Sequence, residues 1–83
     1  MLTRYIQAAM SHAAFEEMED GRWFGTISPC ECLWADGDTI EKCRDELESA
    51  LEDWIIIRFK RDLDLPIIDG IDINQKTVHA EAN

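Results

Sequence analysis

The sequence predicts an α+β domain in which an N-terminal helix precedes a β-β-β-α-β unit, with an antiparallel sheet covered by one long helix. Three observations lead to this fold class. An Asp-Gly dipeptide separates two short strand-like segments, a third such segment follows a proline-containing break, and a long run of helically spaced apolar residues comes next. With 83 residues, the chain has room for one domain over residues 1–83, and we expect its core to span about 14–73.

Residues 2–13 favour a short helix with one apolar face. The apolar residues of this segment recur at three- and four-residue spacing: Leu2, Tyr5, Ile6, Ala9, Met10 and Ala13. A helix this short is marginal on its own in water, so we expect it to dock on the rest of the domain.

The segments 15–19 and 22–27 predict a β-hairpin. The Asp-Gly dipeptide between them suits a two-residue type I′ turn, because both central positions of that turn take positive φ. The second segment alternates, which places Trp23 and Phe24 on opposite faces of the sheet. One of these two aromatic side chains must therefore point away from the covering helix.

A third strand is predicted over residues 32–35, after the break at Pro29, and an Asp-Gly-Asp turn ends it. A long helix then begins at an N-cap provided by Asp38 or Thr39 and runs to about Arg61. Acidic residues dominate its first turns and basic residues its last, as the helix dipole favours. Its apolar positions form one stripe: Ile40, Cys43, Leu47, Ala50, Leu51, Trp54 and Ile57.

The C-terminal half of this helix is apolar on more than one side. Ile55, Ile56 and Phe59 are additional to the stripe, and a helix with a single buried stripe does not need them. A second layer should cover them: the N-terminal helix, another subunit, or both. We predict that these three residues serve self-association.

Residues 67–73 predict a last strand, interrupted at Gly70, after Pro66 ends the helical region. The remaining residues, 74–83, are polar, and we expect them to form a flexible tail.

The charge of the chain is concentrated in one stretch. Lys plus Arg is 8 and Asp plus Glu is 18, which gives a net charge of −10. Residues 16–53 hold thirteen acids and three bases and carry the whole excess, whereas the rest of the chain holds five of each. Such a chain repels phosphate backbones, so we expect no direct nucleic-acid binding. Two explanations remain open: solvated faces that maintain solubility, or a surface for a basic partner protein.

The sequence also bears on location. Its longest uninterrupted apolar run is residues 54–57, whereas a membrane span needs ~20 apolar residues. The N-terminus lacks the apolar core of a signal peptide. An odd number of cysteines, with no secretory signal, indicates reduced thiols. We therefore expect a cytoplasmic protein without a membrane segment.

Catalytic and metal-binding motifs are not evident. His12 and His79 belong to no recognisable triad or dyad. Cys30, Cys32 and Cys43 could hold zinc with His12 as a fourth ligand, but a C-x-C pair is tighter than the usual zinc spacing. We expect neither an enzyme nor a cofactor, and a metal-dependent hydrolase is the least favoured of the alternatives.

Four stretches of turn and packing residues carry a family resemblance. They are GRWFGTI at 21–27, LWADGDTIEKC at 33–43, ALEDW at 50–54 and LDLP at 63–66. Together they resemble the HicB-like antitoxin domain, and the similarity covers about residues 14–68.

The resemblance implies a compact β-β-β-α-β fold and a non-enzymatic role. HicB-like domains bind and occlude small, basic, mRNA-cleaving toxins of the HicA type, and many of them form dimers or tetramers. An acidic body suits such a partner, in agreement with the net charge of −10. The predicted function is therefore that of an antitoxin for a HicA-like ribonuclease. The alternative is a stand-alone homo-oligomeric protein of the same fold with a ligand-binding or structural role.

We place the predicted partner interface on the acidic hairpin and on the turn after the third strand. The acids would steer the partner, and the tryptophan would be a desolvated anchor. The residues of this interface are Glu16, Glu17, Glu19, Asp20, Trp34, Asp36 and Asp38.

Overall fold

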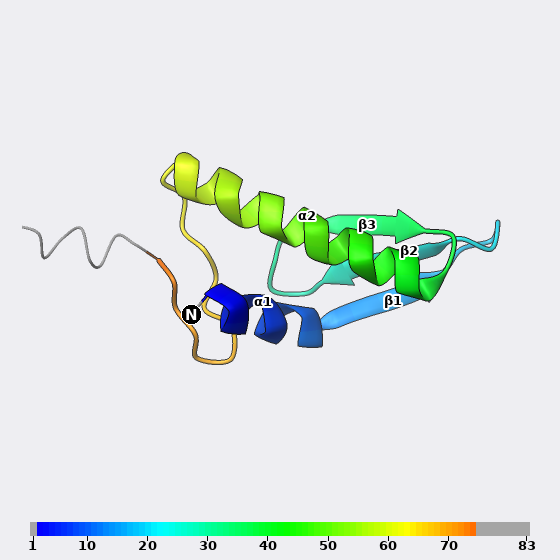
Figure 1. Cartoon of the computed structure of the whole chain (residues 1–83), viewed down its shortest axis with the longest axis horizontal. Helices are drawn as coiled ribbons and strands as arrows, with labels where there is room; N and C mark the ends of the chain where they lie inside the picture. Colours follow the sequence, from blue (N-terminus) through cyan, green and yellow to red (C-terminus); the bar gives the residue numbers. More distant parts are fainter. Residues whose placement is uncertain (1, 75–83) are drawn as a thin grey trace, which may run out of the picture.

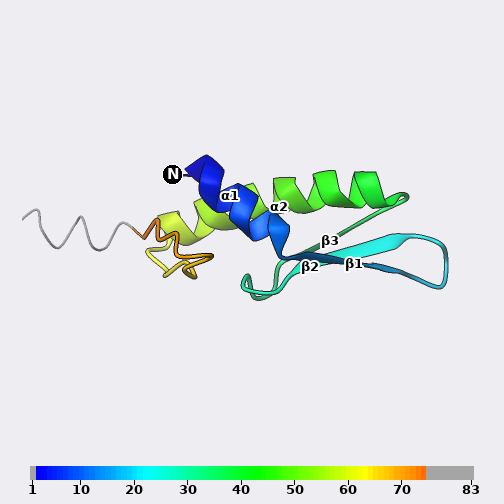
Figure 2. The same cartoon turned by 90° about the horizontal axis from the view of Figure 1, so that it is seen from below.

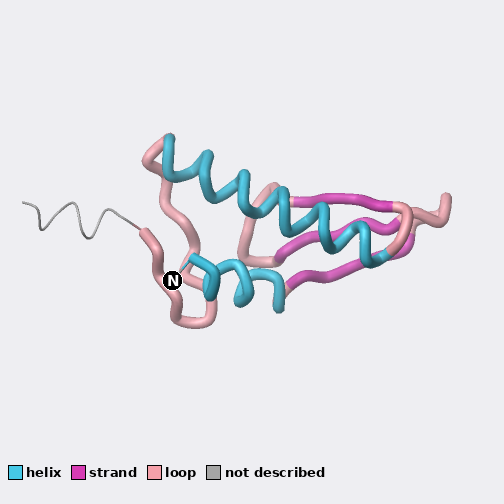
Figure 3. Tube along the Cα trace, in the orientation of Figure 1, coloured by secondary structure: helices cyan, strands magenta, loops and turns pink. Residues whose placement is uncertain are grey.

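The computed structural model describes residues 2–74, which form α1 (Leu2–Ser11), β1 (Ala13–Glu17), β2 (Trp23–Ile27), β3 (Trp34–Gly37) and α2 (Ile40–Lys60). The strands make one antiparallel sheet in the order β1-β2-β3. Both helices lie on the same side of this sheet (Figures 1 and 2), and α2 runs back over β3 from the point where that strand ends (Figure 3). The predicted α+β class is confirmed.

The core lies between α2 and the sheet and continues beneath α1. The buried residues of α2 recur every four positions: Cys43, Leu47, Leu51 and Ile55. The buried residues of α1 are Tyr5, Ala9 and Met10. The Tyr5 hydroxyl donates a 2.6 Å hydrogen bond to the carbonyl oxygen of Pro66, which ties α1 to the segment after α2. The folded unit therefore begins at α1, earlier than the expected core of 14–73.

The predicted apolar stripe of α2 is wrong at its C-terminal end. Ile55 is only 2% exposed and belongs to the core, whereas Ile57 is 49% exposed. Ile55 continues the four-residue spacing of Cys43, Leu47 and Leu51, whereas the predicted stripe steps from Leu51 to Trp54 and Ile57. Ile55 is thus not available for self-association, contrary to the prediction. Phe59 is half-buried against the same core, and Ile56 remains 49% exposed.

The hairpin between β1 and β2 closes differently from the prediction. The Met18 N–H donates to the Arg22 carbonyl at 2.7 Å, and the Gly21 N–H donates to the Met18 carbonyl at 2.9 Å. Within this loop only Gly21 has positive φ, at 88°. This is a three-residue loop, a type I turn followed by a glycine bulge, and not a two-residue type I′ turn. Asp20 has a different role, since its carboxylate accepts the Arg22 N–H at 3.0 Å.

The last strand predicted over 67–73 does not join the sheet. Ile68 and Ile71 form an isolated antiparallel bridge and exchange backbone hydrogen bonds of 3.2 and 2.8 Å. Between them, Asp69 and Gly70 both have positive φ, at 51° and 80°. The type I′ geometry expected at the first Asp-Gly dipeptide thus occurs at the second one. A single bridge across a tight turn is too short to extend the sheet, and Ile68 instead packs into the core.

The ends of the other elements shift by one or two residues from their predicted positions. β1 occupies 13–17 and β3 occupies 34–37, where the sequence favoured 15–19 and 32–35. The predicted N-cap of α2 is confirmed as Thr39, whose Oγ1 accepts the Lys42 N–H at 3.1 Å.

Asn74, the first residue of the predicted tail, is part of the fold. Its side-chain amide accepts the Leu65 N–H at 2.7 Å and donates to the Leu65 carbonyl at 3.0 Å. The other residues of that predicted tail, 75–83, lie outside the described residues.

β3 and α2 approach closely at Gly37. A Cβ atom at this position would lie 2.6 Å from the backbone nitrogen of Cys43, so one of the two backbones would have to move. A Cβ at Gly25 would meet only side-chain atoms, the nearest being a Phe15 ring carbon at 3.0 Å. These distances predict that alanine at Gly37 destabilises the fold more than alanine at Gly25 does.

We expect Gly37→Ala to lower the free energy of unfolding by about 3 kcal/mol and Gly25→Ala by about 1 kcal/mol, because overpacking against a backbone is harder to relieve. Urea denaturation of both variants measures this, with Ser49→Ala, at an exposed position of α2, as the control. Equal losses at the two glycines would contradict the close approach of β3 and α2.

Two buried groups predict a loss of stability at alkaline pH. Burial raises the pKa of Tyr5 from 10.0 to about 12 and that of Cys30 from 9.0 to about 11. A folded-state pKa above the unfolded value stabilises the fold below the unfolded pKa, and this contribution is lost as the pH rises through the folded pKa. The free energy of unfolding should therefore fall between pH 9 and 12.

Denaturant titrations from pH 8 upwards test this expectation. Cys30→Ala should remove the part of the decline that starts near pH 9, and Tyr5→Phe the part that starts near pH 10. Parallel pH profiles for both variants and the parent protein would show that these groups do not cause the decline.

Candidate protein-binding surface

The face of the sheet that points away from the helices carries two rows of three side chains. Directly opposite residues of an antiparallel pair share a face, so the register fixes these rows. They are Ala14, Thr26 and Trp34, then Glu16, Phe24 and Asp36. The rings of Phe24 and Trp34 stack with centroids 5.6 Å apart at 24°, and Trp34 is 56% exposed. The prediction for the two adjacent aromatic residues of β2 is thus confirmed, with Phe24 as the one that points outward.

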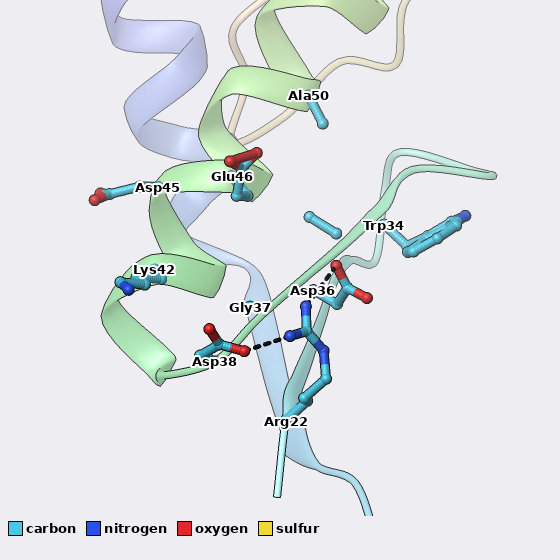
Figure 4. A pocket seen from close by; sticks show the side chains of 10 residues that line it. Arg22, Trp34, Asp36, Gly37, Asp38, Lys42, Asp45, Glu46 and Ala50 are labelled. Carbon is cyan, nitrogen blue, oxygen red and sulfur yellow. Dashed lines mark hydrogen bonds and ion pairs between the residues drawn. The ribbon is translucent and has the colours of Figure 1, made fainter. Parts of the chain in front are cut away.

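Arg22 connects the acids at the end of β3. Its Nη2 lies 3.4 Å from Oδ1 of Asp36, and its Nη1 pairs with Oδ1 of Asp38 (Figure 4). One guanidinium thus bridges two carboxylates, one on the strand and one on the turn into α2. This bridge links the end of β3 to the turn that leads into α2.

An acidic groove runs along the outer edge of β3, between that strand and α2 (Figure 4). It encloses about 660 Å³. Its lining residues include Arg22, Trp34, Asp36, Asp38, Lys42, Asp45, Glu46 and Ala50. Four acidic and two basic residues thus line the groove, and Arg22 is already paired with two of the carboxylates. The groove is therefore negative on balance.

The structure brings together part of the predicted interface. Trp34, Asp36 and Asp38 all line the groove. Glu16 lies in the same row as Asp36 on the open face, with Phe24 between them.

The other three predicted interface residues lie apart from this cluster. Glu17 points to the opposite face from Glu16, because neighbouring residues of a strand alternate. Glu19 and Asp20 belong to the hairpin loop beyond the sheet. The seven residues therefore do not form one continuous site.

Sequence reasoning missed the wall of the groove formed by α2. Lys42, Asp45 and Glu46 were not singled out, nor was Arg22. Their helical spacing places them on one side of α2, but an acidic helix offers several such sides. Only the rotation of α2 over β3 decides which side borders the groove.

The cysteines and histidines do not form a reactive cluster among the described residues. Burial raises the pKa of the Cys30 thiol to about 11, and burial together with the Asp36 carboxylate raises that of Cys43 above its usual 9.0. Both thiols are therefore neutral at neutral pH, and a neutral thiol is a poor nucleophile. His12 instead contacts Asp69, with 2.8 Å between Nε2 and Oδ1.

The part of the chain that the structure describes contains no group of three or more His, Cys, Asp or Glu side chains able to share a metal ion. Within that same part, neither helix has the length and apolar character needed to cross a membrane. The candidate surface itself is charged and aromatic.

Comparison with known proteins shows the family of this chain. A family model described as UPF0150-like matches residues 4–66. The chain belongs to the UPF0150-like family. The match includes most of α1 as well as the sheet and α2, so the N-terminal helix is part of the UPF0150-like domain and not an addition to it. No curated protein matches the chain.

The UPF0150-like fold is shared with a solved structure. The crystal structure of TTHA0281 from Thermus thermophilus is similar to this chain, with 33% sequence identity and a TM-score of 0.81. The similarity covers 87% of this chain and 90% of the other. The arrangement of helices and sheet that forms the groove therefore belongs to a fold that the two proteins have in common.

Proposed function

We propose that this UPF0150-like protein is a HicB-like antitoxin, which binds a small, basic, mRNA-cleaving toxin and occludes its active surface in the cytoplasm. The observation that carries the proposal is the position of the acid excess. Residues 16–53, which hold thirteen acids and three bases, include the end of β1, all of β2 and β3 and most of α2. Twelve of those acids are exposed and the other, Asp36, is half-buried.

An acidic surface suits this role because of what a ribonuclease must bind. A toxin that cleaves mRNA needs cationic side chains around its active site to hold phosphates. Carboxylates on a folded partner compete for the same cations and speed the encounter of the two proteins. The resemblance of residues 14–68 to HicB-like domains supports the same partner class.

Trp34 offers an apolar anchor for the proposed partner, in addition to the charge of the surface. Charge steering determines the encounter, whereas a desolvated aromatic anchor contributes most to residence time. Trp34 is 56% exposed, stacks on Phe24 and lies next to Asp36 in the groove. The stack holds the indole ring in place before binding, which lowers the entropic cost of using it as an anchor.

This proposal predicts that the protein co-purifies with a small basic protein encoded in the adjacent reading frame and suppresses its RNA cleavage. Trp34→Ala should weaken the complex about tenfold or more, as loss of an anchor does. Ile67→Ala removes a similarly exposed apolar side chain (61% exposed) outside the groove and should leave affinity unchanged. The affinity should also fall steeply with added salt.

Calorimetry of the complex and a cleavage assay on a defined RNA measure these effects. A complex that still cleaves RNA, or a Trp34→Ala variant as inhibitory as the parent protein, would rule out occlusion through this surface.

A second candidate function rests on the outer side of α2. Ile56 and Ile57 are each 49% exposed, and Leu63 beyond the helix is 45% exposed. Such a patch favours a homo-oligomer, the alternative that the sequence leaves open.

The homo-oligomer predicts that Ile56→Asp shifts the protein towards monomer without loss of stability, because a charge there would be buried only in the assembly. Ile55→Ala is the contrasting variant, and it should lower the free energy of unfolding by about 3 kcal/mol because Ile55 is in the core. Sedimentation velocity and urea denaturation separate the two effects. A parent protein that is already monomeric would end this candidate.

A further inference from the structure

β3 is an edge strand of the sheet. The strand order β1-β2-β3 leaves it hydrogen-bonded to β2 alone within residues 2–74. An edge strand presents one row of backbone N–H and C=O groups that no other strand uses, and such a row can accept a further strand.

The hairpin bonds show which residues of β3 present those groups. In an antiparallel ladder, hydrogen-bonded and non-hydrogen-bonded pairs alternate. Met18 and Arg22 are hydrogen-bonded across the first hairpin, so Phe24 and Thr26 direct their backbone groups towards β1. The residues opposite them on β3, Asp36 and Trp34, then direct theirs away from β2, towards the free edge.

The same edge forms one wall of the acidic groove. Trp34 and Asp36 line the groove from the strand, and Glu46 lines it from α2; Asp45 also belongs to the groove, but its carboxylate points away from β3 (Figure 4). Neither Asp45 nor Glu46 has an ion pair among the described residues, whereas Asp36 shares Arg22 with Asp38. The free backbone groups of β3 therefore lie beside acidic residues that have no ion-pair partner among the described residues.

We propose that an extended, basic segment of a partner protein adds to β3 as a fourth strand of the sheet. Its backbone pairs with the outward groups of Trp34 and Asp36. Alternate side chains of an added strand point to opposite faces, so one set of Lys or Arg residues enters the groove towards Glu46 and the side of α2 that also carries Asp45. The other set lies over the open face beside Trp34. This inference rests on the proposed function and specifies how the basic partner is held.

Charge favours a basic partner over a second copy of this chain at the edge. Pairing β3 with β3 of another copy would bring two acidic grooves together, each with four carboxylates and two cationic groups. Like charges placed directly opposite in a sheet are unfavourable, and charged edges are a common defence against self-pairing. A segment with Lys or Arg at alternate positions would instead place positive side chains next to the carboxylates of the groove, which turns this repulsion into attraction.

The probe is a terminally blocked Lys-Val-Lys-Val-Lys-Val peptide. A matched peptide has the same residues with alternate backbone nitrogens methylated, which keeps the charge but removes the donors needed for strand pairing. Two-dimensional NMR of the full chain measures binding and the exchange rates of individual amide hydrogens. We expect the first peptide to slow exchange at Trp34 and Asp36 and to bind about tenfold more tightly than the methylated one.

Two charge-matched variants locate the binding site. Asp45→Lys with Glu46→Lys should abolish the tighter binding of the unmethylated peptide. Glu48→Lys with Glu52→Lys makes the same change in net charge at exposed positions of α2 outside the groove, and it should weaken binding by about twofold at most. Equal affinity for the two peptides, or equal effects of the two double variants, would reduce the contact to general electrostatic attraction and overturn the proposal.

The remaining outcomes separate this inference from the proposed function. Slowed exchange at Trp34 and Asp36 that depends on protein concentration without any peptide would show that a second copy occupies the edge, against the proposal. An inhibited ribonuclease complex in which these two amides exchange as in the free protein would keep the antitoxin function and reject strand addition. Slowed exchange in the presence of the peptide, with no ribonuclease partner found, would support strand addition and reject the antitoxin function.

Discussion

The contact between β3 and the start of α2 requires that the facing side chains be very small. At Gly37 even a Cβ atom would lie 2.6 Å from the Cys43 nitrogen, and the other inward residue of β3 is Ala35. These small residues let α2 lie close to the strand, but they contribute little apolar volume to the core. The large inward side chains of the sheet come from β1 and β2 instead: Phe15, Trp23 and Ile27. The large apolar side chain of β3, Trp34, lies on the open face, where it stacks on Phe24.

The close approach of α2 also accounts for the groove. A helix seated directly over an edge strand covers the inner side of that strand and leaves its outer edge free. Asp45 and Glu46 then border the edge only because Cys43 and Leu47 are held inward. The packing of α2 and the groove are thus linked: the residues that fix the rotation of α2 also decide which acids border the groove.

The parts of the fold that follow local rules could be predicted from the sequence. The order of helices and strands, the Thr39 cap and the outward position of Phe24 depend on residue spacing and capping chemistry within a few positions. The errors arise where distant parts of the chain meet. Ile55 shares one core with residues of α1 and with Ile68, and this core buries the side of α2 that continues from Cys43, Leu47 and Leu51. The two Asp-Gly dipeptides adopt different turns because Met18 and Arg22 pair across the first one and lengthen its loop.

The candidate site also has a part that could be predicted from the sequence and a part that depends on how the elements pack. The concentration of acids between residues 16 and 53 could be read directly, and Trp34, Asp36 and Asp38 were identified from turn and strand patterns. Lys42, Asp45, Glu46 and the bridging Arg22 could not be identified, because an acidic helix has several equivalent sides until its packing is known. The separation of Glu17 from Glu16 required only the alternation of the strand, and grouping them by charge alone overlooked it.

The size of the charge excess argues for a partner and against solubility as its sole purpose. A net charge of magnitude about 2–8 is enough to keep a small domain soluble, whereas this chain has −10 and carries it within residues 16–53. Like charges so close together repel one another and oppose the compact state. Arg22 bridges Asp36 and Asp38, but its charge is already counted in the −10, so this bridge leaves the excess unchanged. A surface that keeps this repulsion in the free protein gains most when a cationic partner binds, because binding then relieves the repulsion as well as forming new contacts.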